Sequence, residues 1–158
     1  MGTEGLTSVL DAAGARYDLL PHAHTETAAA AAEALGLAPA DVAKTLVVAT
    51  PEGYVRAVLP ASERIDLGKL SEIVGERKKA LRLASEEELE RDYPDFELGA
   101  VPPVGGARRD PVVLDSRLAE RESIVFEAGS HEESVRLAPA ELVRVAGAEV
   151  ADICLGDR

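Results

Sequence analysis

Hydrophobic residues recur at helical spacing in several stretches of the chain. Between Thr3 and Ala13, the residues Leu6, Val9 and Leu10 fall on one face of a helix and Gly14 follows, which predicts a helix that ends at this glycine. Residues that favour the start or the end of a helix predict four more helices. These lie over residues 28–34 after Thr27, 67–74 before Gly75, 86–92 after Ser85, and 139–147.

Shorter apolar runs predict strands. Residues 44–49 and 54–59 flank Pro51-Glu52-Gly53, which is typical of a hairpin. Other strands are expected over residues 16–20, 111–114, 124–126, 134–137 and 149–153. Helices alternate with strands, yet several strands are joined by short turns. The pattern therefore predicts an α/β fold with a mixed central sheet, curled into an open barrel and surrounded by helices.

The strand predicted over residues 44–49 is apolar on both faces, which indicates that both faces are covered. Lys44 stands at its start. An ammonium group in such a strand is costly unless it reaches a partner or a cleft. The alternative is that the lysine stem packs while its amine extends into water. The strand pattern leaves both interpretations open.

Size and charge narrow the function classes. The 158 residues (16.6 kDa) suit one domain spanning 1–158. The formal net charge of −12 argues against a broad DNA- or RNA-binding surface, because such surfaces depend on clustered Lys and Arg. A small local contact stays open. Its candidates are Arg77-Lys78-Lys79 with Arg82, while we interpret Arg108-Arg109 as a solvated loop.

The chain contains no apolar run long enough to cross a membrane, and its start lacks the apolar core of an export signal. We therefore expect a cytoplasmic protein with no membrane partner. The single cysteine, Cys154, has no base beside it in the sequence and is interpreted as a small apolar residue of the core.

The segment Gly99–Gly106 holds three glycines and two prolines, including Gly99, Pro103 and Gly105. Such a loop is rigid, and its backbone can approach another molecule closely. Its N–H groups are candidates to bind a carbonyl oxygen, a terminal phosphate or a ribose. The same composition also suits a plain connection between two elements.

Three histidines are candidate site residues. His131 is expected in the turn between two strands, where it could contact a substrate or act as a base. Ser130 beside it does not suggest a triad, because neighbouring residues on an extended chain point apart. His22 and His24 would share a strand face, and a metal site there needs a third ligand, for which His131 or a carboxylate is a candidate, but no spaced motif supports such a site. We favour a role for one of them in positioning a nearby loop.

Taken in order, four segments resemble the YbaK/prolyl-tRNA editing family. They are the Ala-rich helix after Thr27 that ends at Leu35-Gly36, the stretch Val42–Val48 with Lys44, the GxxxP loop from Gly99 to Pro103 with Gly105, and Phe126–His131. The likeness covers the chain from about His22 to Asp152. The lysine strand and the GxxxP loop together are more specific than either alone.

The resemblance implies hydrolysis of the ester between an amino acid and the terminal ribose of tRNA, without metal, cofactor or covalent intermediate. Lys44 matches the family's essential lysine, and Gly99 and Pro103 match its GxxxP motif. His131 falls where some members contact substrate, and we add His22 and Gly105 as candidate substrate-binding residues. Alanine or cysteine on proline tRNA is the substrate that the family suggests.

The residues suit this chemistry. Loop N–H groups would stabilise the developing oxyanion, at about 3–4 kcal/mol for each well-placed donor. Lys44, cationic at neutral pH, would hold the terminal phosphate or the ester. The sequence offers no clear general base, so the ribose hydroxyl is expected to orient the water. The acidic chain would grip only the acceptor end of the tRNA or rely on a synthetase for affinity.

Two other interpretations stay open. The chain could be a binding module that has kept the fold without the activity, since fold does not fix function. It could also hydrolyse another amino-acid ester or a thioester in the same pocket.

Overall fold

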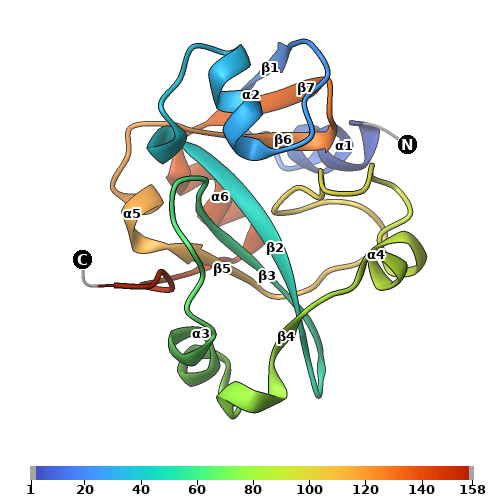
Figure 1. Ribbon diagram of the computed structural model, residues 1–158. Coiled ribbons are helices and arrows are strands. Elements are labelled where there is room, and N and C mark those ends of the chain that lie inside the picture. Colours follow the sequence, from blue (N-terminus) through green and yellow to red (C-terminus); the bar gives the residue numbers. More distant parts are fainter. Residues whose placement is uncertain (1–2, 157–158) are drawn as a thin grey trace.

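The computed structural model describes residues 3–156 and is built around one eight-stranded sheet (Figure 1). Seven strands follow the order β1-β7-β6-β2-β3-β5-β8, and β4 pairs with β2 outside this path. The pairs β2–β6, β3–β5 and β5–β8 are parallel, and the other pairs are antiparallel. The sheet is mixed and unclosed, which confirms the predicted α/β class.

The strands are β1 (Tyr17–Pro21), β2 (Val42–Thr50), β3 (Gly53–Pro60), β4 (Arg82–Leu83), β5 (Val112–Asp115), β6 (Ile124–Ser130), β7 (Glu133–Leu137) and β8 (Glu149–Ala151). The α-helices are α1 (Glu4–Ala12), α2 (Ala28–Ala34), α3 (Leu67–Val74), α4 (Glu86–Asp92), α5 (Ser116–Ala119) and α6 (Pro139–Ala146), and the 3₁₀ turns are η1 (Pro39–Asp41) and η2 (Lys78–Ala80).

Helices cover both faces at the centre of the sheet. On one face, Leu10 of α1 and Leu142 of α6 pack in a cluster with Phe126 of β6. On the other, Leu70 of α3 packs in a cluster with Val48 of β2. Val47 and Ala49 of β2 pack in a third cluster with Tyr93, so the strand is covered on both sides over residues 47–49, as predicted, whereas residues 44–46 are only half-buried.

The edge of β2 that faces away from β3 is only partly paired. Along its other edge β2 pairs with β3 from Ala43 to Thr50. On the free side, β6 pairs with Val42 and Ala43, and β4 pairs with Val48 and Ala49. Within residues 3–156, positions 44–47 therefore have no strand partner on this side, and the sheet opens there.

Most helix boundaries follow the predicted capping residues. The Thr27 hydroxyl accepts a hydrogen bond from the Ala30 N–H at 3.0 Å, and Ser85 forms a reciprocal capping box with Glu88. Gly75 ends α3 with φ of 75°, a left-handed conformation that glycine adopts without strain. The sequence did not predict β4 or α5, because two- and four-residue elements leave no periodic pattern.

Cys154 lies in the core, as predicted. It is fully buried, and burial first of all raises the pKa of its thiol to about 12, with Asp115 adding to the effect. Such a thiol is inert at neutral pH. In the part of the chain that the structure describes, every helix is too short or too polar to cross a bilayer.

Candidate active site

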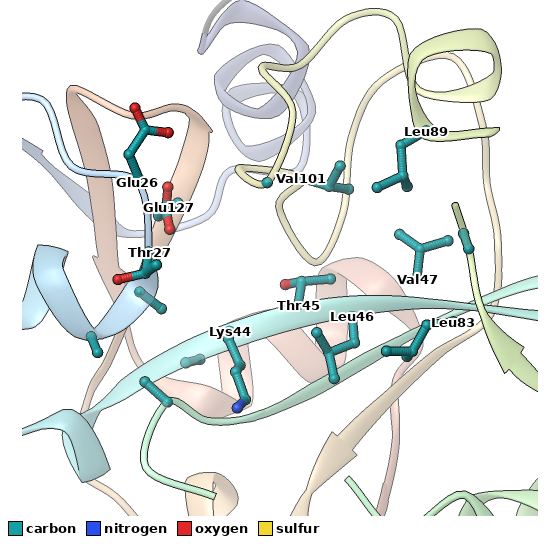
Figure 2. Close-up of a pocket in the computed structure, with 16 residues that line it drawn as sticks. Glu26, Thr27, Lys44, Thr45, Leu46, Val47, Leu83, Leu89, Val101 and Glu127 are labelled. Carbon is teal, nitrogen blue, oxygen red and sulfur yellow. The ribbon is translucent and has the colours of Figure 1, made fainter. Parts of the chain in front are cut away.

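A cavity of about 410 Å³ lies at the opening in the sheet, beside residues 44–47 of β2. Its walls come from the start of α2, the segment after β3, β4, α4, the loop at Gly99, and β6. Figure 2 shows polar groups gathered at one end (Glu26, Thr27 and Glu127) and apolar ones at the other (Leu89 and Val101). A polar end beside an apolar end is typical of a small-molecule site.

Lys44 lines this cavity and is half-buried. Its side chain leaves β2 on the side opposite Thr45 (Figure 2), as expected for neighbouring strand residues. Among the residues that the structure describes, the amine forms no hydrogen bond or ion pair. Burial, the largest effect, lowers the pKa of Lys44, Arg64 lowers it further, and Glu63 partly opposes this. The amine is thus a partly desolvated cation that an anionic group would stabilise.

Gly99 brings the GxxxP loop to the same cavity, and Val101 lies beside it. Gly99 has φ of 84° and is exposed. Within residues 3–156, the backbone N–H groups of Gly99 and Val101 donate to no protein acceptor. They are therefore available to a bound carbonyl or phosphate oxygen.

The other end of the loop turns away from this cavity. Pro103 and Gly105 line a second hollow, which they share with α1 and α6. Arg56 of β3 is 1% exposed and holds this end: its guanidinium donates to the carbonyls of Pro102 (3.0 Å) and Gly105 (2.8 Å). Sequence reasoning missed Arg56, although a charged residue in an apolar strand is the same signal that singled out Lys44.

His131 is buried in the turn between β6 and β7, with 4% of its surface exposed. Its Nε2 lies 2.6 Å from the carbonyl oxygen of Leu98, and its backbone N–H donates to Glu97 at 2.7 Å. These bonds tie the turn to the residues just before Gly99. The structure therefore places His131 behind the GxxxP loop.

Glu127 is the site residue that sequence reasoning missed. It lines the cavity from β6 with 6% exposure, and its Oε2 lies 3.0 Å from Nδ1 of His131. Burial, as the main cause, raises the pKa of Glu127 to about 7; Glu26 and Glu97 add to this and His131 opposes it. A carboxyl group that titrates near neutral pH inside a cavity is suited to proton transfer.

Thr45 also lines the cavity, between its polar and apolar ends (Figure 2). Its hydroxyl oxygen is buried and forms no hydrogen bond within residues 3–156. A buried hydroxyl without a partner costs free energy. A polar ligand in the cavity would remove that cost.

His22 and His24 lie outside the cavity lining and bond to nearby groups. His22 bridges the Ser134 hydroxyl (2.9 Å) and the Ala23 carbonyl (2.8 Å), while Nε2 of His24 lies 2.6 Å from Glu26. In residues 3–156 no three His, Cys, Asp or Glu side chains are grouped to hold a metal ion. His22 thus fastens the segment before α2 to β7.

Comparison with known proteins identifies the family. Residues 22–145 match the model of the aminoacyl-tRNA editing domain. The chain is 30% identical over 152 residues to the multifunctional Ser/Thr-tRNA deacylase ProXp-y of Escherichia coli K12, covering 93% of this chain and 89% of that protein. It is 28% identical over 128 residues (80% and 76% of the two chains) to EbsC of Enterococcus faecalis, provisionally described as a Cys-tRNA(Pro)/Cys-tRNA(Cys) deacylase.

Solved structures agree with this assignment. A crystal structure provisionally described as a trans-editing enzyme for prolyl-tRNA synthetase superposes with a TM-score of 0.84 at 32% identity, over 98% of this chain and 97% of that one. The hypothetical protein APE2540 superposes with a TM-score of 0.87 at 29% identity, over 96% and 99%. The cavity with its lysine and GxxxP loop therefore lies in a chain that belongs to the aminoacyl-tRNA editing domain family.

Proposed function

We propose that this protein is a trans-editing deacylase, which hydrolyses the ester between a wrongly attached amino acid and the terminal ribose of tRNA. The observation that supports this most is the composition of one cavity lining: Lys44, whose partly desolvated amine leaves β2 on the side opposite Thr45, the N–H groups of Gly99 and Val101, which have no acceptor within residues 3–156, and the buried carboxyl of Glu127. The residues 1–158 would act as one editing domain in the cytoplasm.

Each group has a role that its chemistry suits. The Lys44 amine would hold the terminal phosphate or the ester as an electrostatic clamp. The N–H of Gly99 would donate to the oxyanion that develops on the ester carbonyl, where one lost donor typically costs about 10²–10³ in rate. The neighbouring ribose hydroxyl would orient the attacking water, so that hydrolysis is assisted by the substrate and needs no metal or cofactor.

The remaining candidate residues would act by shaping this site. His131 fixes the backbone before Gly99, and His22 fastens the segment that leads to α2. Gly105 anchors the far end of the loop against α1 and Arg56, and Pro103 lines the hollow beside it. They would set the position of the donors and would contact substrate only through the loop.

The tRNA would be gripped at its acceptor end alone. Arg77, Lys78 and Lys79 are exposed, and Leu83 of the neighbouring β4 lines the cavity. This short basic segment, which β4 joins to the cavity wall, would meet the first phosphates of the acceptor strand without a broad basic surface. An aminoacyl-tRNA synthetase would supply further affinity if these contacts are too few.

For the amino acid, we propose alanine or cysteine on proline tRNA. Ala28, Ala29 and Ala61 lie in the walls of the cavity and leave space for the side chain of an amino acid. The related proteins named above are described as deacylases for different amino acids, so the amino acid that is removed differs within the family.

The proposal predicts a defined substrate profile for the purified protein. Proline tRNA charged with alanine, cysteine, serine or proline, and the simple ethyl esters of the same amino acids, would be incubated with it and the remaining ester measured. We expect at least tenfold faster release of alanine or cysteine than of proline, and little hydrolysis of the ethyl esters. Failure to hydrolyse any aminoacyl-tRNA would contradict the proposal, and equal rates on ethyl esters would indicate a general esterase.

A further inference from the structure

The buried pair Glu127–His131 is the feature of the cavity that the roles assigned above leave unused. Nε2 of His131 faces the carbonyl oxygen of Leu98 at 2.6 Å, and a carbonyl can only accept a hydrogen bond. Nε2 therefore carries a proton. Nδ1 faces Oε2 of Glu127 at 3.0 Å, and neither atom brings a proton of its own when both groups are neutral imidazole and carboxylate.

The contact between Nδ1 and Oε2 consequently needs one further proton. It belongs either to the imidazole, which gives an imidazolium–carboxylate ion pair, or to the carboxyl group. Losing it would leave two lone pairs facing each other in a buried site. Burial lowers the pKa of His131, but the Leu98 carbonyl and the charge of Glu127 outweigh this and raise it. The pair is thus built to retain a proton at neutral pH and to move it between its members.

The second oxygen of Glu127, Oε1, is left for the cavity. In residues 3–156 the Glu127 side chain forms no hydrogen bond other than that to His131. Unlike the buried Thr45 hydroxyl, Oε1 is not among the buried side-chain atoms that lack a partner, so it remains accessible. Figure 2 shows the Glu127 carboxyl directed toward Glu26 and Thr27, at the polar end of the cavity.

We infer that Glu127 is the proton-transfer residue of the hydrolysis, an inference that rests on the proposed function. The water oriented by the ribose hydroxyl bonds through its oxygen to the ester carbon, and its proton passes to the Glu127 carboxylate. When the bond from that carbon to the ribose oxygen breaks, Glu127 gives the proton to the leaving oxygen. The products are the free amino acid and tRNA with its terminal hydroxyl restored.

Other charged groups face this carboxylate. Glu26 precedes α2, Glu97 lies in the loop before Gly99, and His131 lies in the turn after β6. Lys44 of β2 also lines the cavity, but its amine is directed to the side of β2 opposite Thr45 (Figure 2). The two glutamates disfavour the ionised form of Glu127, and the histidine favours it. Because the base must be ionised to accept a proton, the rate should rise with pH until Glu127 is a carboxylate, near pH 7.

The test is the single-turnover deacylation rate of the best misacylated tRNA between pH 5.5 and 8.5, after subtraction of spontaneous hydrolysis. The wild-type rate should rise close to tenfold per pH unit in the acid range and level off near 7. Glu127→Gln, which keeps the size of the side chain, should lose about 100-fold or more at pH 7.5 and should lose this rise. Glu26→Gln removes an exposed carboxylate from the same cavity and should keep the rise.

The outcomes separate this inference from the proposed function. A wild-type protein that hydrolyses no aminoacyl-tRNA contradicts the proposed function itself. An active wild type whose rate does not change between pH 5.5 and 7, or a folded Glu127→Gln within threefold of the wild type, overturns only the role of Glu127. The wild-type pH profile decides the question even if Glu127→Gln does not fold, because it requires no variant.

Discussion

Replacing Gly105 by alanine is expected to lower the free energy of unfolding by about 2–5 kcal/mol. Gly105 has φ of 101°, where a side chain is strained. A Cβ atom there would lie 2.4 Å from the backbone oxygen of Gly5 in α1 and 2.9 Å from Cα of Leu6. Both neighbours are backbone atoms, so the helix or the loop must move.

Thermal unfolding measures this effect and can separate its two causes. For a protein of this size, a loss of 1 kcal/mol lowers Tm by about 2–4 °C, so Gly105→Ala should lower it by roughly 4–20 °C. Gly36→Ala is the matched control: its φ is 71°, but no atom lies within 4 Å of the added Cβ. It should cost about 1–2 kcal/mol from backbone strain alone. Equal losses in both variants would show that the contact with α1 does not matter.

Replacing Lys44 by methionine is expected to reduce the deacylation rate about 100-fold and to leave stability within about 1 kcal/mol of the wild type. Methionine keeps the packed stem but removes the charge that would hold the phosphate or ester. Stability should not suffer, because in residues 3–156 the amine has no hydrogen-bond or ion-pair partner and its pKa is already lowered by burial.

Lys69→Met is the matched control for Lys44→Met, and we expect it to affect stability but not the deacylation rate. The Lys69 amine bonds to Asp152 at 3.0 Å and to the backbone oxygens of Cys154 and Gly156 at 2.7 Å, and Lys69 is not part of the cavity lining. Its loss should lower Tm and leave the rate at 25 °C unchanged. If Lys44→Met keeps full activity, the proposed role of Lys44 as an electrostatic clamp is wrong. If Lys44→Met loses stability as Lys69→Met does, Lys44 has a structural role.

Much of the fold could be predicted from the sequence, because local signals determine it. Thr27, Ser85 and Gly75 mark helix ends through hydrogen bonds and a backbone conformation that few other residues provide. The order of the strands could not be predicted in the same way. The parallel pairing of β2 with β6 joins residues about eighty positions apart, and no local pattern records such a pairing.

The site was predictable only in part. The sequence singled out Lys44 and Gly99, which the structure brings to one cavity, but it did not show that Pro103 and Gly105 turn toward a second hollow. The opening in the sheet that creates the cavity arises because β6 and β4 cover different parts of one edge of β2. A partial pairing of this kind depends on strand length and twist, which the residue pattern does not define.

Glu127 was missed for a different reason. It follows Phe126 in a strand that was predicted to end there, whereas β6 continues to Ser130 through an irregularity between Glu127 and Ser130. This extension buries His131, which the sequence placed in an open turn. An acidic residue directly after an apolar strand is common at strand ends, so only the continued strand reveals its burial.

The most direct test of the proposed site is the binding of a stable analogue, in which an amide replaces the ester between alanine and the 3′ position of adenosine. Titrating it into isotope-labelled protein and recording amide chemical shifts locates the ligand without any turnover. The largest shifts should fall on Lys44, Thr45 and Gly99, which line the cavity beside β2. Shifts confined to Arg56, Gly105 and Arg109 would place the ligand in the second hollow and contradict the assignment of the active site.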